Sequence, residues 1–63
     1  MYAIQHKDNH MFITGTDFSQ RDGSGFRQFL CSHPMKTYEK KSEAVEDFKK
    51  RKCGKQYKVV KLD

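Results

Sequence analysis

The sequence predicts a small α+β domain in which strands and one helix follow in the order βββαβ, with the helix packed on one face of an antiparallel sheet. Three observations lead to this fold class: an N-terminal run of alternating residues, a helical segment around residue 45 with acids before bases, and a strand-like segment that closes the chain. Because the chain has 63 residues, we expect a single compact domain over residues 1–63.

The first two strands are predicted to form a hairpin. Residues 2–6 and 11–14 alternate in polarity, and the turn-forming pair at 8–9 lies between them. With that pair as the loop, Ile4 faces Ile13 across the hairpin. The face that carries these isoleucines is expected to form the core.

A polar segment and a third strand follow. Residues 16–25 are rich in Thr, Asp, Ser, Gly and Gln, which predicts an exposed, mobile loop. The third strand is expected at 26–31, and Pro34 lies beyond its end because proline cannot continue a central ladder. In the connection at 35–41, Tyr38 is the residue expected to reach the core.

The helix is the clearest local pattern. Ser42 is the predicted N-cap and Gly54 the residue just beyond the C-terminus, with acids in the first turns and bases in the last. The closing segment 56–62 has strand composition and is expected to lie at a sheet edge. The apolar stripe of the helix is predicted to be Ala44, Val45 and Phe48, completed by Cys53.

These segments together resemble a known class of small proteins. An alternating hairpin, a polar loop, an aromatic strand, a T-Y-E-K-K-S-E-A-V-E-D-F-K-K helix and a terminal Y-K-V-V-K-L strand look like the small accessory proteins of bacteriophage and prophage genomes. The resemblance extends over most of the chain and is one of pattern, without a catalytic or ligand signature. It implies a compact accessory protein that binds and redirects a host macromolecule, and it transfers no site residue.

The net charge of +5 is confined to the C-terminal part of the chain. Residues 1–35 hold three basic and three acidic side chains, whereas residues 36–63 hold ten basic and five acidic ones. Within residues 49–61 there are seven cations and no acid. This excess favours an anionic partner. The alternative is a solvated helix end, where cations complement the helix dipole without any ligand.

Two binding functions remain open from the sequence. The first is a host protein with an acidic surface, which this chain binds and then modulates or inhibits. The second is sequence-tolerant DNA or RNA binding by the basic C-terminal cluster. Within the polar loop, Phe18 is a candidate apolar anchor. The predicted partner-binding residues are Phe18, Arg21, Lys49, Lys50, Arg51, Lys52, Lys55 and Lys58.

No catalytic site, metal site or cofactor is expected, and no small-molecule substrate. Cys31 and His33 form half of a metal-ligand pattern, and Cys53 stands apart from them. A sheet with one helix also offers little concavity for catalysis. The chain lacks both the roughly 18 consecutive apolar residues of a membrane span and the pattern of a secretion signal. We therefore expect a complete cytoplasmic polypeptide whose thiols are reduced.

Overall fold

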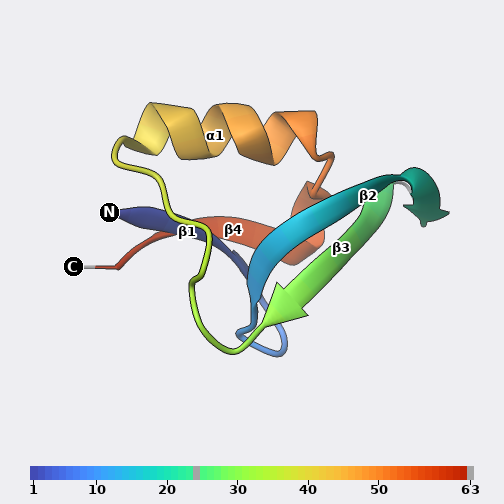
Figure 1. Cartoon of the computed structure of the whole chain (residues 1–63), viewed down its shortest axis with the longest axis horizontal. Coiled ribbons are helices and arrows are strands. Elements are labelled where there is room, and N and C mark those ends of the chain that lie inside the picture. Colours follow the sequence, from blue (N-terminus) through green and yellow to red (C-terminus); the bar gives the residue numbers. More distant parts are fainter. Residues whose placement is uncertain (24, 63) are drawn as a thin grey trace.

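The computed structural model describes residues 1–23 and 25–62. Within these residues, a four-stranded antiparallel sheet with the spatial order β3-β2-β1-β4 carries the helix α1 on one face (Figure 1). The order along the chain is βββαβ, so the predicted α+β fold is confirmed. The elements are β1 (Tyr2–His6), β2 (Phe12–Asp22), β3 (Gly25–Cys31), α1 (Lys41–Lys50), the short 3-10 helix η1 (Gly54–Gln56) and β4 (Tyr57–Lys61).

The first hairpin has the predicted register. Gln5 lies opposite Phe12, which places Ile4 opposite Ile13. Both isoleucines are almost completely buried, and they are the largest side chains of the chain's described part to be so. The face assigned to the core is therefore confirmed. Ala3, on the opposite face of β1, is buried as well, so this central strand is covered on both sides at that point.

The strand β2 is longer than predicted. It runs to Asp22, so the prediction of a loop is wrong for residues 16–22, although residues 18–21 are exposed as predicted. Residue 24 of the predicted loop lies outside the described residues. Thr16 lies opposite Gln28 of β3, and the two strands form a long hairpin that extends beyond the helix (Figure 1). Pairing with β3 outweighs the low strand preference of this polar segment, because such preferences depend strongly on tertiary context.

Both predicted ends of the helix are displaced. The N-cap is Lys40, not Ser42, and its main-chain amide donates a hydrogen bond to Glu43 Oε1 at 3.1 Å. Glu43 thereby satisfies the cap from within the first turn, which leaves Ser42 inside the helix. At the other end the left-handed residue after the C-cap is Lys52, with φ of 50°. The predicted C-terminal role of Gly54 is thus wrong, although Gly54 is itself left-handed, with φ of 75°.

The helix stripe packs on the sheet as predicted. Ala44 is fully buried, and Phe48 contacts a cluster formed by Ile4, Ile13 and Cys53. No polar or charged residue of the described segments is buried. The core is therefore small and almost entirely apolar. Each contact in it contributes a large part of the free energy of unfolding, which is small for a domain of this size.

The connection between β3 and α1 extends the sheet locally. Tyr2 and Tyr38 exchange two main-chain hydrogen bonds of 2.8 Å, and the Tyr38 side chain packs against the core. The expectation for Tyr38 is therefore confirmed. No helix within residues 1–23 and 25–62 is long and apolar enough to cross a membrane.

Candidate interaction surface

An aromatic and basic cluster occupies the far end of the β2–β3 hairpin. We call Phe18, Arg21, Phe26 and Lys52 the hairpin-tip cluster. The rings of Phe18 and Phe26 meet edge to face with centroids 5.1 Å apart. The Arg21 guanidinium lies 5.1 Å and the Lys52 ammonium 5.8 Å from the centroid of Phe26. Phe26 thus contacts one exposed aromatic ring and lies within cation–π distance of two basic side chains.

The position of Phe18 follows from an irregularity in β2. The register between β2 and β3 shifts between Asp17 and Arg21, so the residues between them bulge out of the ladder. Ser19 fixes this bulge by donating its hydroxyl and its amide to Asp17 Oδ1, at 2.6 and 3.0 Å. These hydrogen bonds, the hydroxyl first, hold the pKa of Asp17 below its ordinary value. Phe18 is left 50% exposed.

A close main-chain approach brings Lys52 to the hairpin. A Cβ atom on Gly25 would lie 2.3 Å from the main-chain oxygen of Lys52, so only glycine fits at this position. The same approach leaves a groove of about 380 Å³ beside the cluster, between the hairpin and η1. Its lining includes Phe26, Lys52, Lys55 and Tyr57. The structure thereby adds Lys55 to the neighbourhood of the hairpin-tip cluster.

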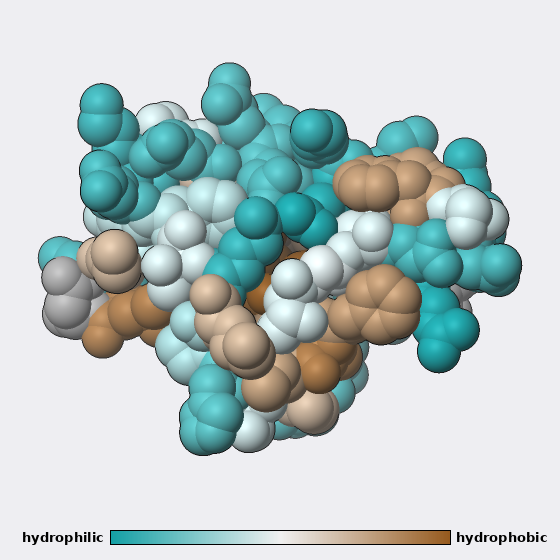
Figure 2. Space-filling view, in the orientation of Figure 1, coloured by the Kyte–Doolittle hydropathy of each residue, from teal (hydrophilic) through white to brown (hydrophobic). Residues whose placement is uncertain are grey.

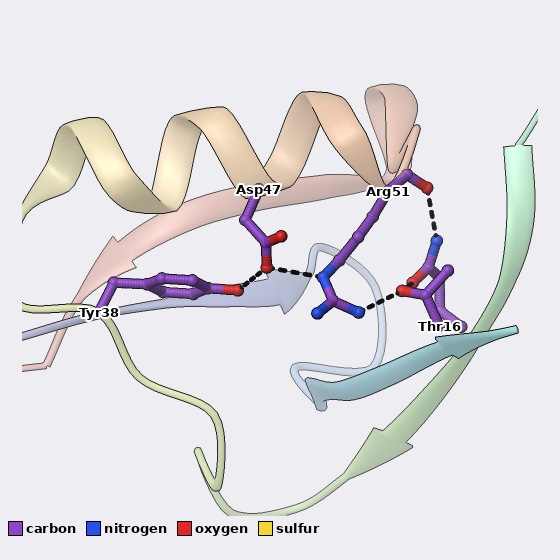
Figure 3. A network of polar contacts seen from close by, with 5 residues as sticks. Thr16, Tyr38, Asp47 and Arg51 are labelled. Atoms are coloured by element: carbon purple, nitrogen blue, oxygen red, sulfur yellow. Dashed lines mark hydrogen bonds and ion pairs between the residues drawn. The ribbon is translucent and has the colours of Figure 1, made fainter. Parts of the chain in front are cut away.

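Arg51 is placed differently from the other predicted cations. Its Nε donates to Asp47 at 2.7 Å, and its Nη1 donates to the Thr16 hydroxyl at 2.6 Å (Figure 3). The side chain is only 12% exposed. Arg51 therefore ties the end of α1 to β2, and Asp47 offsets its charge. This leaves little of the guanidinium for a partner.

The hydrogen bonds around Arg51 form a closed network. Tyr38 donates its hydroxyl to Asp47, and Thr16 donates its hydroxyl to Gln28 (Figure 3). The Gln28 amide in turn donates to the main-chain oxygen of Arg51 at 2.9 Å. The network joins α1, both strands of the long hairpin and the connection before the helix. It connects the start of the long hairpin to the end of the helix.

The network sets the protonation of two of its members. Burial alone disfavours the charged form of Asp47, but the hydrogen bonds from Tyr38 and Arg51 outweigh burial, and the pKa of Asp47 lies below its ordinary value of 3.8. Burial, and then the neighbouring Asp47, raises the pKa of Tyr38 above its ordinary value of 10.0. At neutral pH the pair is thus a phenol that donates to a carboxylate.

The remaining predicted cations lie outside the hairpin-tip cluster. Lys49 and Lys50 are exposed in the last turn of α1, and Lys50 shares a shallow depression with Glu43 and Glu46. Lys58 is exposed on β4. The basic segment 49–61 is therefore divided over three elements instead of forming one continuous surface.

Phe26 is the member of the hairpin-tip cluster that is absent from the predicted set of partner-binding residues. Its place beside Arg21 depends on the pairing of these two residues across the β2–β3 hairpin. That pairing is invisible while residues 16–25 are interpreted as a loop. The available signal was the aromatic residue directly after Gly25, at the start of a strand.

A second exposed ring lies apart from the cluster. Phe29 is 46% exposed, its ring lies against Gly15, and the Arg27 guanidinium is 5.8 Å from its centroid. In Figure 2, hydrophobic side chains gather over the long hairpin and below it, whereas the surface of the helix is hydrophilic. The exposed apolar surface in this view thus belongs mainly to the sheet side of the molecule.

The two cysteines differ in burial, because Cys53 is buried and Cys31 is only partly covered. Both are free thiols, and burial raises the pKa of Cys53 to about 11, so it remains protonated at neutral pH. Among residues 1–23 and 25–62, no group of three or more His, Cys, Asp or Glu side chains is placed to hold a metal ion.

Comparisons with known proteins give no information about the function of this surface. The chain was compared with protein-family models, with curated proteins and with solved structures, and none of these matches it. The case for a function therefore depends on the chemistry of the surfaces that the fold exposes.

Proposed function

We propose that this chain is a small non-enzymatic accessory protein of the phage type, acting in the cytoplasm, that binds an acidic surface of a host protein and modulates or inhibits it. The observation that carries the proposal is the hairpin-tip cluster. It presents the half-exposed ring of Phe18 on Phe26, and the cationic groups of Arg21 and Lys52 lie near the ring of Phe26.

This arrangement has the features of a protein-binding hot spot. Aromatic and arginine side chains supply most of the binding energy at protein interfaces, and flanking polar groups exclude water from them. Contact with Phe26 already restrains Phe18, so less side-chain entropy is lost when a partner covers it. The net charge of +5 attracts an acidic partner during encounter.

The sequence-based alternative, DNA or RNA binding, also has one observation in its favour. Lys52 and Lys55 line the same groove as two aromatic rings, which is a combination that binds phosphates and stacks bases. Against it, Arg51 is neutralised by Asp47, and Lys50 lies among acids. The basic surface is therefore broken, and we favour the protein partner.

The proposal is tested by two matched variants. Phe18→Ala removes the exposed ring of the cluster, and Phe29→Ala removes an equally exposed ring elsewhere. The binding partner for this test is the host protein that the tagged chain captures from bacterial lysate. We expect Phe18→Ala to weaken binding to this captured host protein by about 2 kcal/mol, or about 30-fold, and Phe29→Ala to leave the affinity unchanged. Calorimetric titration of the captured protein measures both. Equal losses in the two variants, or no loss in Phe18→Ala, would contradict the assignment.

A further inference from the structure

The sheet has two edges, and only one of them is regular. The register between β3 and its neighbour β2 shifts twice, because β2 holds extra residues at both places, so the pairing at this side of the sheet is irregular. In contrast, β4 pairs with β1 over five consecutive residues without a shift. An extended segment can join a regular edge of this kind as an additional strand.

Two hydrogen bonds fix the pairing pattern of β4. The Lys7 amide donates to the Gln56 carbonyl at 2.9 Å, and the Leu62 amide donates to the Met1 carbonyl at 2.9 Å. In an antiparallel ladder, pairs that exchange hydrogen bonds alternate with pairs that do not. Between these two ends, residues 58 and 60 therefore bond to β1.

The intervening residues turn their main chain to the open edge. By the same alternation, the N–H and C=O groups of Val59 and Lys61 point away from β1. Tyr2 supports this pattern, because it lies opposite Lys61 and its main chain bonds to Tyr38 on the other side of β1. The edge thus offers main-chain donors and acceptors at two alternate positions.

The positive charge of the side chains at this edge favours some binding partners over others. Lys55, Lys58 and Lys61 are exposed, and residues 54–62 contain no acid. A second copy of the chain would bring the same lysines and a further charge of +5 to the edge, so self-pairing is disfavoured. An extended segment that carries carboxylates is complementary to it.

We propose that β4 accepts an extended acidic segment of the partner protein as a fifth strand of the sheet. The main chain of Val59 and Lys61 supplies the hydrogen bonds, and the ammonium groups of Lys58 and Lys61 pair with carboxylates of the segment. The inference rests on the proposed function, since it states which part of the host protein is bound. It uses a surface that shares no residue with the hairpin-tip cluster.

The test uses a synthetic peptide of four Glu-Val repeats, labelled with fluorescein, and a second peptide that is N-methylated at every residue. We expect the first peptide to bind and the second to fail, because N-methylation removes the donors and blocks the approach of the strand. Hydrogen exchange followed by NMR should show that the amides of Val59 and Lys61 become protected in the complex.

Three variants separate main-chain pairing from charge. Lys61→Gln keeps the outward N–H, and we expect about threefold weaker peptide binding. Lys61→Pro removes that N–H without breaking a bond to β1, and we expect a further loss of about tenfold. Lys49→Gln, on the helix, controls for the non-specific electrostatic attraction between the basic chain and the acidic peptide, and it should change the affinity for the peptide by less than about twofold. Circular dichroism confirms that each variant is folded.

Equal binding by Lys61→Pro and Lys61→Gln, or binding of the N-methylated peptide, would overturn strand addition. Concentration-dependent protection of the Val59 and Lys61 amides without peptide would also overturn it, because a second copy would then occupy the edge. If the captured host protein no longer binds the Phe18→Ala variant but binds the Lys61→Pro variant with the affinity of the parent, this inference fails and the proposed function stands. If no host protein is captured while the peptide binds, the proposed function fails instead.

Discussion

Asp47 is the residue on which the internal network depends. It accepts hydrogen bonds from Tyr38 and from Arg51, and both hold its carboxylate in the charged form against the effect of burial. Its pKa is lower in the folded chain than in the unfolded chain. The resulting stabilisation is complete above the ordinary value of 3.8 and is lost as the pH falls through the lower, folded value.

Asp47→Asn should therefore change the dependence of stability on pH. At pH 7 we expect a loss of about 1 to 2 kcal/mol in the free energy of unfolding, because charged hydrogen bonds are lost. As the pH falls from 5 toward 2, the parent should lose more stability than the variant. Urea denaturation across this range measures both, with Glu46→Gln as the control for an exposed acid. Parallel curves for parent and Asp47→Asn would contradict the role of Asp47.

Gly25 provides a second prediction at the scale of one residue. The added Cβ of Gly25→Ala would meet the Lys52 main chain, which cannot move as a flexible side chain can. We expect a loss of about 1 to 3 kcal/mol and a displaced hairpin tip. Gly15→Ala is the matched control, because its Cβ would make only an ordinary contact of 3.7 Å with Phe29. Similar thermal midpoints for the two variants would show that the close approach is absent in solution.

The elements differ in how far their sequences determine them. The helix is predictable because its apolar residues recur with the helical period, and the first hairpin because its apolar residues alternate. The burial of Ile4 and Ile13 and the packing of Phe48 against them follow from these periods. The extension of β2 is not predictable in this way. Residues 16–21 are mostly polar because this part of β2 is largely exposed, and only pairing with β3 reveals it as a strand. For the same reason the sequence indicates Phe18, Arg21 and Lys52 as binding candidates but not Phe26, the ring that lies beside all three.

The helix depends on one aromatic contact with the sheet. Phe48 packs against the cluster of Ile4, Ile13 and Cys53, so Phe48→Ala should cost about 3 kcal/mol of stability. For a domain with so small a core, this can be most of the total. Val45→Ala, at a half-buried position outside that cluster, should cost about 1 kcal/mol. Equal unfolding midpoints in urea would mean that Phe48 does not anchor the helix.

At the scale of the whole molecule, the residues that hold the fold together differ from most of those that we propose to bind a partner. The small apolar core and the polar network hold the sheet and the helix together, and Arg51 and Tyr38 belong to this framework. The exposed rings of Phe18 and Phe29 lie on the long hairpin, and the exposed Lys58 and Lys61 lie on the edge strand β4. Substitutions at Phe18 should therefore alter binding and leave the thermal midpoint within about 2 °C of the parent.

The central claim is that the partner is a protein, and nuclease treatment tests it most directly. The tagged chain is used to capture partners from bacterial lysate with and without nuclease, and the retained material is quantified by mass spectrometry and nucleic-acid staining. We expect one host protein to be retained, in near-equal amount with and without nuclease. Recovery that collapses after nuclease treatment would contradict it and would assign Lys52, Lys55 and Arg21 to phosphate binding instead.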